Sequence, residues 1–145
     1  MSRVPSNTTV AVLLGGWSAE REVSLSSGKA CTAALDRAGF RTVPIDVRRE
    51  TIVADLQRVK PDVAFNALHG KWGEDGCCAA ILETLQIPYT HSGVLASSLA
   101  MHKEKSKTVF LKRVAVGTVT EAGLRTAKIL CADEGTPILK GMKLL

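Results

Sequence analysis

The chain has 145 residues, of which 46% are hydrophobic and 23% charged, and this is the composition of a folded domain that can bury a core without disulfides or metal ions. It excludes an intrinsically disordered chain, because disordered chains have few apolar residues and a high net charge. The net charge of +5 favours a solvated basic surface, and nucleic acid is not an expected partner because no basic stretch is interleaved with the two Trp, one Tyr and three Phe.

The first apolar segment, residues 10–14, is too short for a signal peptide or a membrane span. We therefore expect a cytoplasmic protein with no membrane partner. No two cysteines form a C-x-x-C pair, so neither zinc binding nor thioredoxin-like chemistry is predicted. Small, buried and reduced side chains are expected at all four cysteine positions. These are Cys31, Cys77, Cys78 and Cys131.

Segments with a strand pattern alternate with segments that have a helix pattern. The run 9–14 is apolar throughout and ends at Gly15-Gly16, which is typical of a strand buried on both faces of a parallel sheet. The predicted strand 42–47 contains Pro44, which indicates an edge position. Further strands are predicted at 63–68 and 87–90, and helices at 22–37, 51–58, 77–85, 94–100 and 103–113.

Strands alternating with helices imply βαβ units, so the expected fold class is α/β, with an open parallel sheet in a three-layer α/β/α arrangement. This domain is placed at residues 1–115, and 116–145 is assigned to a linker and the start of a further domain, with a helix at 122–133. The first two helices are expected to turn apolar side chains toward the sheet. The expected inward residues are Val23, Ala30, Ala33, Ala34 and Leu35 in the first helix and Ile52, Val53 and Leu56 in the second.

Ligands of an open parallel sheet bind beyond the carboxyl ends of its strands. Two loops leave such ends, residues 15–22 and 69–76, and they share one crevice if the first and third strands are neighbours. The first loop does not fit the dinucleotide fingerprint G-x-G-x-x-G, because its glycines are adjacent and Glu20 stands where the third glycine would fall. A nicotinamide-dependent oxidoreductase is therefore disfavoured, since this carboxylate would repel a pyrophosphate.

Glu20 is the candidate ligand for an amine. The dipole at a helix N-terminus stabilises the ionised carboxylate, which suits the ammonium group of a small amino acid. The alternative is a glutamate that only caps the helix. Arg21 could form an ion pair with Glu20 or Glu74, and three serines near the helix start could cap it. These are Ser24, Ser26 and Ser27.

His69 ends the third predicted strand, where it can offer a positive charge or a hydrogen-bond donor to a carboxylate. The alternative is a histidine that only bonds loop carbonyls. Glu74 and Asp75 are expected to open the next helix, where carboxylates are favoured. Lys103 could reach a nucleotide phosphate as a point charge, or belong to a solvated basic face. Neither a Ser-His-Asp order nor metal-ligand spacing is present, so no covalent hydrolase and no metal site is predicted.

Three ordered motifs resemble those of the D-alanine–D-alanine ligases, of the ATP-grasp superfamily. They are V-A-V-L-L-G-G and S-A-E-R-E-V-S-L within 10–25, A-L-H-G and G-E-D-G within 67–76, and I-P-Y-T, S-G-V, A-S and M-H-K within 87–103. The resemblance covers residues 10–113 and implies a Rossmann-like pre-ATP-grasp domain.

The resemblance also implies a reaction. The family joins two D-alanines into the dipeptide of peptidoglycan precursors: ATP phosphorylates the carboxylate of the first D-alanine, and the amine of the second attacks the acyl phosphate. By this resemblance Glu20 binds the first ammonium with help from the backbone at Val23, His69 lies near the first carboxylate, and Lys103 contacts ATP. Mg²⁺ as a cofactor and a homodimer are implied as well.

The sequence departs from the family pattern at several positions. His102 stands where the family usually has Asp or Asn, and Trp72 and the pair Cys77-Cys78 are unusual. The family's Lys-Pro and Gly-Ser-Ser loop, lid residues, magnesium carboxylates and phosphoryl-stabilising arginine are not found in the chain. We therefore expect a truncated N-terminal ligase domain, inactive alone, with D-alanine, D-lactate and D-serine all open as second substrate. The alternative is a non-catalytic remnant that binds an amino acid or pairs with an intact ligase subunit.

Overall fold

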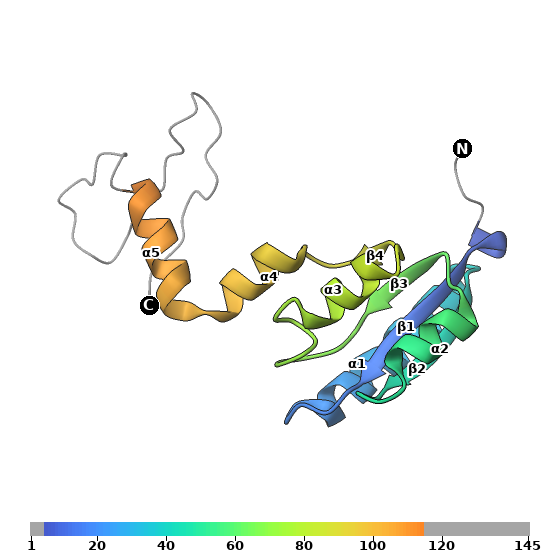
Figure 1. Ribbon diagram of the computed structural model, residues 1–145. Helices are drawn as coiled ribbons and strands as arrows, with labels where there is room; N and C mark the ends of the chain where they lie inside the picture. Colours follow the sequence, from blue (N-terminus) through green and yellow to red (C-terminus); the bar gives the residue numbers. More distant parts are fainter. Residues whose placement is uncertain (1–4, 115–145) are drawn as a thin grey trace. The chain divides into compact units, whose positions relative to one another are not determined.

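A computed structural model describes residues 5–114 of the chain. The chain divides into two units, the first ending at Met101 and the second beginning at His102. The first unit contains the sheet and the helices around it (Figure 1). The boundary expected between residues 115 and 116 and the helix expected at 122–133 lie outside the described residues.

The sheet has four parallel strands in the order β2-β1-β3-β4. The strands are β1 (Thr9–Gly15), β2 (Arg41–Val47), β3 (Val63–Asn66) and β4 (Tyr89–Thr90). β1 is paired on both sides and every one of its residues is buried, which explains its unbroken apolar sequence. β2 lies at the edge, as Pro44 predicts, because a residue without an N–H is tolerated in an outer strand.

Helices cover both faces of the sheet, which confirms the three-layer α/β/α prediction. α1 (Arg21–Arg37) packs Leu25 and Leu35 against Val10, Val12 and Leu14 of β1. α2 (Ile52–Val59) and α3 (Cys77–Thr84) pack on the opposite face. That second cluster includes Ala11 and Leu13 of β1, Ile52 and Leu56 of α2, and Cys78 and Leu82 of α3.

The inward face of α1 differs from the prediction. Val23 is 55% exposed, and the predicted core positions Ala30, Ala33 and Ala34 are exposed as well. The fully buried positions are Ser24 and Gly28. A Cβ on Gly28 would overlap the side chain of Leu14, so the missing side chain lets α1 lie directly on β1.

Other predictions of burial have mixed outcomes. In α2, Ile52 and Leu56 are buried as expected, but Val53 is 43% exposed. Among the described cysteines, Cys78 is buried, Cys31 is half-buried and Cys77 is exposed, so the expected burial is wrong for Cys77. Adjacent helical residues point in different directions, and only one of the pair can face the sheet.

Strand β3 ends two residues before its predicted end because Asn66 redirects the chain. Its side-chain oxygen accepts a hydrogen bond from the N–H of Leu68, and its amide nitrogen donates to the carbonyl of Gly73. The Ala67 N–H still donates to the Leu13 carbonyl, which keeps the start of the loop on β1. The side chain of Asn66 thus fixes the entry into the loop that carries His69.

The remaining elements follow the sequence predictions closely. α4 (Val94–Met101) closes the first unit, and α5 (Lys103–Val114) belongs to the second. A short 3₁₀ helix, Pro5–Asn7, precedes β1 and was not predicted. Among the described residues no helix is long and apolar enough to cross a membrane.

Candidate functional site

The two loops singled out in the sequence lie together at the carboxyl end of the sheet. β1 and β3 are neighbours in parallel register, so their ends at Gly15 and Asn66 open on the same edge. The hydroxyl of Ser18, in the first loop, donates a hydrogen bond of 2.8 Å to the carbonyl of His69, in the second. The condition for a shared crevice is therefore met.

Glu20 directs its carboxylate toward the second loop. It is the N-cap residue of α1 but makes no side-chain capping hydrogen bond, so the capping alternative is not observed. A Cβ placed on Gly70 would lie 2.5 Å from Glu20 Oε1, and Gly70 has a φ of +68°. The positive φ favours glycine at this position. Glu20 is exposed, and within residues 5–114 its carboxylate forms no ion pair.

His69 is held by α1. Its Nε2 lies 2.8 Å from the hydroxyl oxygen of Ser27, and this hydroxyl also lies 2.8 Å from the carbonyl oxygen of Val23, to which it donates. A hydroxyl has one hydrogen and a carbonyl only accepts, so this network assigns a proton to His69 Nε2, which donates to Ser27. The ring thus bonds a helix hydroxyl, and the loop-carbonyl alternative is not observed.

Val23 lies between these two groups in the sequence of α1. It is the third residue of the helix, so its N–H belongs to the first turn, whose amides have no helical carbonyl as partner. Its side chain is 55% exposed. An exposed valine beside a free first-turn amide is consistent with a surface that a ligand can reach.

The serines near the start of α1 do not cap it. The hydroxyl of Ser24 is buried and donates 2.8 Å to the carbonyl of Ala67, and Ser27 bonds Val23 and His69. A helix is capped by the side chain of its N-cap residue, which accepts hydrogen bonds from the first-turn amides. Both serines lie inside the helix, after the N-cap residue Glu20. They instead connect α1 to the loop after β3, and this is the device that brings Glu20 and His69 to one place.

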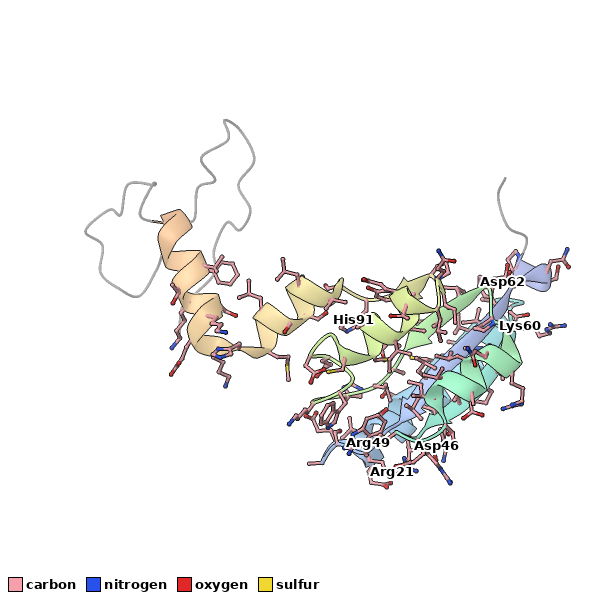
Figure 2. The ribbon with its side chains drawn as sticks, in the orientation of Figure 1. Arg21, Asp46, Arg49, Lys60, Asp62 and His91 are labelled. Atoms are coloured by element: carbon pink, nitrogen blue, oxygen red, sulfur yellow. The ribbon has the colours of Figure 1, made fainter. Side chains whose placement is uncertain are left out.

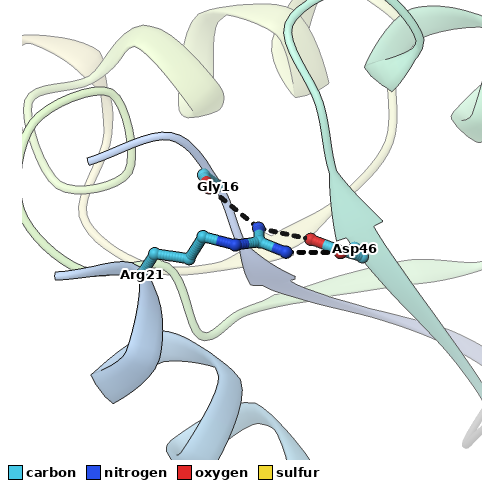
Figure 3. A network of polar contacts seen from close by, with 3 residues as sticks. All are labelled: Gly16, Arg21 and Asp46. Atoms are coloured by element: carbon cyan, nitrogen blue, oxygen red, sulfur yellow. Dashed lines mark hydrogen bonds and ion pairs between the residues drawn. The ribbon is translucent and has the colours of Figure 1, made fainter. Parts of the chain in front are cut away.

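Arg21 pairs with Asp46 of β2, so the expected ion pair with Glu20 or Glu74 is wrong. Two guanidinium nitrogens each lie 2.7 Å from a carboxylate oxygen of Asp46, and one also donates 2.9 Å to the carbonyl of Gly16 (Figure 3). The hydrogen bond from Arg21 lowers the pKa of Asp46 below its usual value, against a smaller opposing effect of burial. Glu20 is thereby left without a competing cation from its neighbour.

Glu74 and Asp75 fold their own loop and do not lie in the helix that follows it. Glu74 accepts a 2.7 Å hydrogen bond from the N–H of Gly70, and Asp75 accepts from the N–H groups of Trp72 and Cys77. Burial acts to raise the pKa of Asp75, but these hydrogen bonds outweigh it and the pKa is lowered. Glu74 therefore holds Gly70, the residue after His69, in position, and Asp75 holds the backbone at Trp72 and Cys77.

Two tryptophans flank the site on the β2 side. Trp17 and Trp72 come from the two loops, with ring centroids 6.0 Å apart, and the Arg49 guanidinium lies over both rings. An open hollow of about 380 Å³ adjoins Trp17 and is lined by Gly16, Trp17, Arg21 and residues 47–50. Figure 2 shows Arg49, Arg21 and Asp46 at one end of the strands and Lys60 and Asp62 at the other.

Lys103 is exposed and opens α5, in the second unit. In the same unit, the Nδ1 of His102 accepts a hydrogen bond from the N–H of Lys105. The structure thus places Glu20, Val23 and His69 together, while Lys103 lies in the other unit. Over the described part of the chain, no group of three or more His, Cys, Asp or Glu side chains is arranged to hold a metal ion.

Comparison with known proteins identifies the domain. A family model described as D-ala D-ala ligase N-terminus matches residues 49–92. The D-alanine–D-alanine ligase of Parvibaculum lavamentivorans is 65% identical over 101 residues, which are 70% of this chain and 32% of the relative. The chain carries the N-terminal domain of the D-alanine–D-alanine ligase family.

Other relatives agree with this assignment. The ligase of Rhizobium meliloti is 61% identical over 128 residues, 88% of this chain and 38% of the relative. The crystal structure of the Bacillus anthracis ligase complexed with ATP superposes with a TM-score of 0.66 at 36% identity, covering 72% of this chain and 36% of that one. The chain therefore spans about a third of the length of the D-alanine–D-alanine ligases that it matches.

Proposed function

We propose that this chain binds the first D-alanine in a D-alanine–D-alanine ligase reaction, with Glu20 receiving the ammonium group and His69 lying at the carboxylate. The observation that carries the proposal is the position of the Glu20 carboxylate against Gly70, the residue that follows His69. A small zwitterion needs a negative and a positive group a few ångströms apart on facing surfaces. The first-turn amides of α1, Val23 among them, add donors beside it.

The hydrogen-bond network defines what His69 can do for a carboxylate. Because Nε2–H is donated to Ser27, only Nδ1 is left for the ligand. In a neutral ring that nitrogen is an acceptor and would repel a carboxylate, whereas in the imidazolium it donates and carries positive charge. We therefore propose that His69 contacts the carboxylate through Nδ1, as a hydrogen-bond donor.

The rest of the reaction requires a nucleotide. The Bacillus anthracis relative was solved with ATP, and we propose that ATP phosphorylates the bound carboxylate here too, with Lys103 as one phosphate contact. When bound, Mg²⁺ would neutralise phosphate charge, but residues 5–114 offer no cluster that fits it. The contribution of this domain is to hold and orient the first substrate before the amine of the second attacks.

Calorimetric titration of D-alanine into the chain tests the amine-binding role. Glu20→Gln keeps the size of the side chain and removes its charge, so the dissociation constant should rise by about 10-fold to 100-fold, the cost of losing a charged hydrogen bond. Glu22→Gln is the matched control, because Glu22 is also exposed and opens α1. Equal affinities for Glu20→Gln and Glu22→Gln would disprove the role of Glu20.

Catalysis is tested in a chimera. We expect the 145-residue chain alone to form no D-alanyl-D-alanine from D-alanine and ATP. Residues 9–101, placed in the Parvibaculum lavamentivorans ligase in exchange for the matching segment, should restore synthesis, and Glu20→Gln in this chimera should abolish most of it. If the chain binds D-alanine but the folded chimera is inactive, the non-catalytic amino-acid-binding module is favoured instead.

The proposal has three further parts that come from the resemblance. The dipeptide would enter peptidoglycan precursor synthesis, the protein would be cytoplasmic, and two copies would form a homodimer. Light scattering on the eluting peak of a gel-filtration column measures the last of these directly. A monomer at micromolar concentration would remove the homodimer from the proposal and leave the D-alanine site untouched.

A further inference from the structure

The only two tryptophans of the chain lie against each other beside the candidate site, on its β2 side. Trp17 lies three residues before Glu20, and Trp72 lies three residues after His69. Their ring centroids are 6.0 Å apart with an angle of 37° between the planes, which is within the range of favourable aromatic pairs. Each ring is therefore attached to one of the two loops that carry the proposed substrate ligands.

Cations join this pair to a third segment of the chain. The guanidinium carbon of Arg49, just after β2, lies 5.4 Å from the centroid of each tryptophan ring. The ammonium of Lys71 lies 4.7 Å from the Trp72 ring. Both distances are those of cation–π contacts. The loops after β1, β2 and β3 thus meet in one cluster.

The backbone of Trp72 is in a conformation that a bulky residue rarely adopts. Its φ is +75°, in the left-handed region, whereas the other positive φ values in this loop belong to Gly70 and Gly76. Its N–H donates to Asp75 and its carbonyl accepts from the N–H of Cys78, so the surrounding loop imposes this conformation. Such strain is kept only where neighbouring contacts over-determine it, and it is concentrated at functional sites.

The side chain of Trp17 is also unfavourable for the stability of the fold. Trp17 Nε1 is buried, and within residues 5–114 it has no hydrogen-bond partner. A buried donor without a partner is unfavourable compared with the same donor in water. Neither the positive φ of Trp72 nor the unpaired donor of Trp17 stabilises the fold, which points to a role for the ring pair at the adjacent site.

We infer that Trp17, Trp72 and Arg49 form an aromatic latch that positions Glu20 and His69 for the substrate without touching it. The latch holds the two loops from the β2 side, while the Ser27–His69 and Ser24–Ala67 hydrogen bonds hold them from α1. All three latch members are positioning residues. This inference rests on the proposed D-alanine site, whose ligands the latch would hold in place.

The decisive variant is Trp72→Gly, because glycine removes the ring and also relieves the positive φ, so the chain should still fold. We expect the dissociation constant for D-alanine, measured by calorimetry on the 145-residue chain, to rise about tenfold or more. Trp72→Phe keeps an aromatic ring and should recover most of the affinity. Lys60→Gly is the matched control: Lys60 also has a positive φ, of 48°, but lies at the opposite end of the strands, and its variant should bind normally.

A second measurement does not depend on the ligand. In a ¹⁵N-labelled chain, the His69 Nε2–H that bonds Ser27 should be protected from water and give a ring N–H signal, distinct from those of His91 and His102. Trp72→Gly should weaken or abolish that signal, and Lys60→Gly should leave it unchanged.

The outcomes separate the two proposals. If the wild-type chain binds no D-alanine, the proposed function fails, and the His69 signal still decides whether the latch orders the loop. If Trp72→Gly leaves both the D-alanine affinity and the His69 signal at wild-type values, the latch is overturned, whatever its effect on thermal stability.

Discussion

Asp46 is a single side chain that ties three segments together at the site. It accepts two hydrogen bonds from Arg21, the first residue of α1, and the same guanidinium reaches the carbonyl of Gly16. The bidentate geometry is the favourable one for an arginine and a carboxylate. Both side chains are more than a third exposed, so the pair is screened by water and its main effect is on geometry.

The ion pair predicts a dependence of stability on pH. Arg21 holds the pKa of Asp46 below its ordinary value of 3.8, so the pair stabilises the folded chain above that value and the contribution is lost as pH falls through the folded-state pKa. Urea midpoints of wild type and Asp46→Asn, measured from neutral pH down to about pH 2, should therefore converge below about pH 4. A constant difference at every pH would contradict the pairing.

At this scale the sequence singles out candidate ligands more readily than the residues that support them. Glu20 and His69 stand out because a carboxylate and an imidazole follow buried strands. Ser27 and Asp46 do not, since a contact between distant segments depends on strand order and helix rotation. One signal was available: Glu20, Ser24 and Ser27 are spaced to share one face of a helix, which indicates a polar face turned toward a partner.

The contact between α1 and β1 depends on the absence of a side chain. Gly28 is buried in the middle of the helix, a position where glycine is unfavourable by about 1 kcal/mol relative to alanine. The structure explains the choice, because even a methyl group would overlap Leu14, whose side chain is rooted in the central strand. At this position the close packing of α1 on β1 therefore outweighs the low helix propensity of glycine.

Gly28→Ala should therefore destabilise the chain, although it improves helix propensity. Overpacking against Leu14 should lower the free energy of unfolding by about 1–3 kcal/mol, as measured by urea denaturation. Gly93→Ala is the control, because a Cβ there has no neighbour closer than 4.0 Å. A Gly28→Ala variant that is more stable than wild type would show that α1 can move away from β1 at no cost.

The same contact explains where prediction of the elements failed. Each described α-helix and strand was predicted near its observed place, because the change from strand to helix periodicity is local in the sequence. The inward face of α1 was predicted from apolar residues, and Val23, Ala30, Ala33 and Ala34 are in fact exposed. Hydrophobicity identifies a buried face poorly where a helix lies so close to a strand that its fully buried positions are small residues, here Ser24 and Gly28.

The whole sheet is organised around β1. This strand pairs with β2 over seven residues and with β3 over four, and it contributes side chains to the hydrophobic clusters on both faces. Breaking its hydrogen bonds requires both cores to open. The free energy needed to open β1 should therefore equal the free energy of unfolding the whole unit, whereas the outer strands can open locally.

Hydrogen exchange followed by NMR tests this. Amides of Ala11 to Leu14 should exchange most slowly, with an opening free energy equal to the global one from urea denaturation. Amides of β4, which has two residues, should exchange faster. Equal protection in β1 and β4 would mean that the unit opens only as a whole.

At the scale of the molecule, the fold class could be predicted from the alternation of strand and helix patterns in the sequence. The order of the strands in the sheet could not. β1 reads as central because it is apolar throughout, and Pro44 marks β2 as an edge. The adjacency of β1 and β3, on which the site depends, was only a condition in the sequence argument. It is fixed by long-range packing, which periodicity does not encode.

Pro44 has a consequence for how copies of this chain meet. An open sheet offers its margins as templates on which a foreign strand can grow, the first step toward cross-β aggregates. Here one margin presents a proline ring with no amide hydrogen, and the other presents a strand of two residues. Neither gives an incoming chain enough consecutive backbone groups to bind, so this sheet is poorly suited to recruit strands from another molecule.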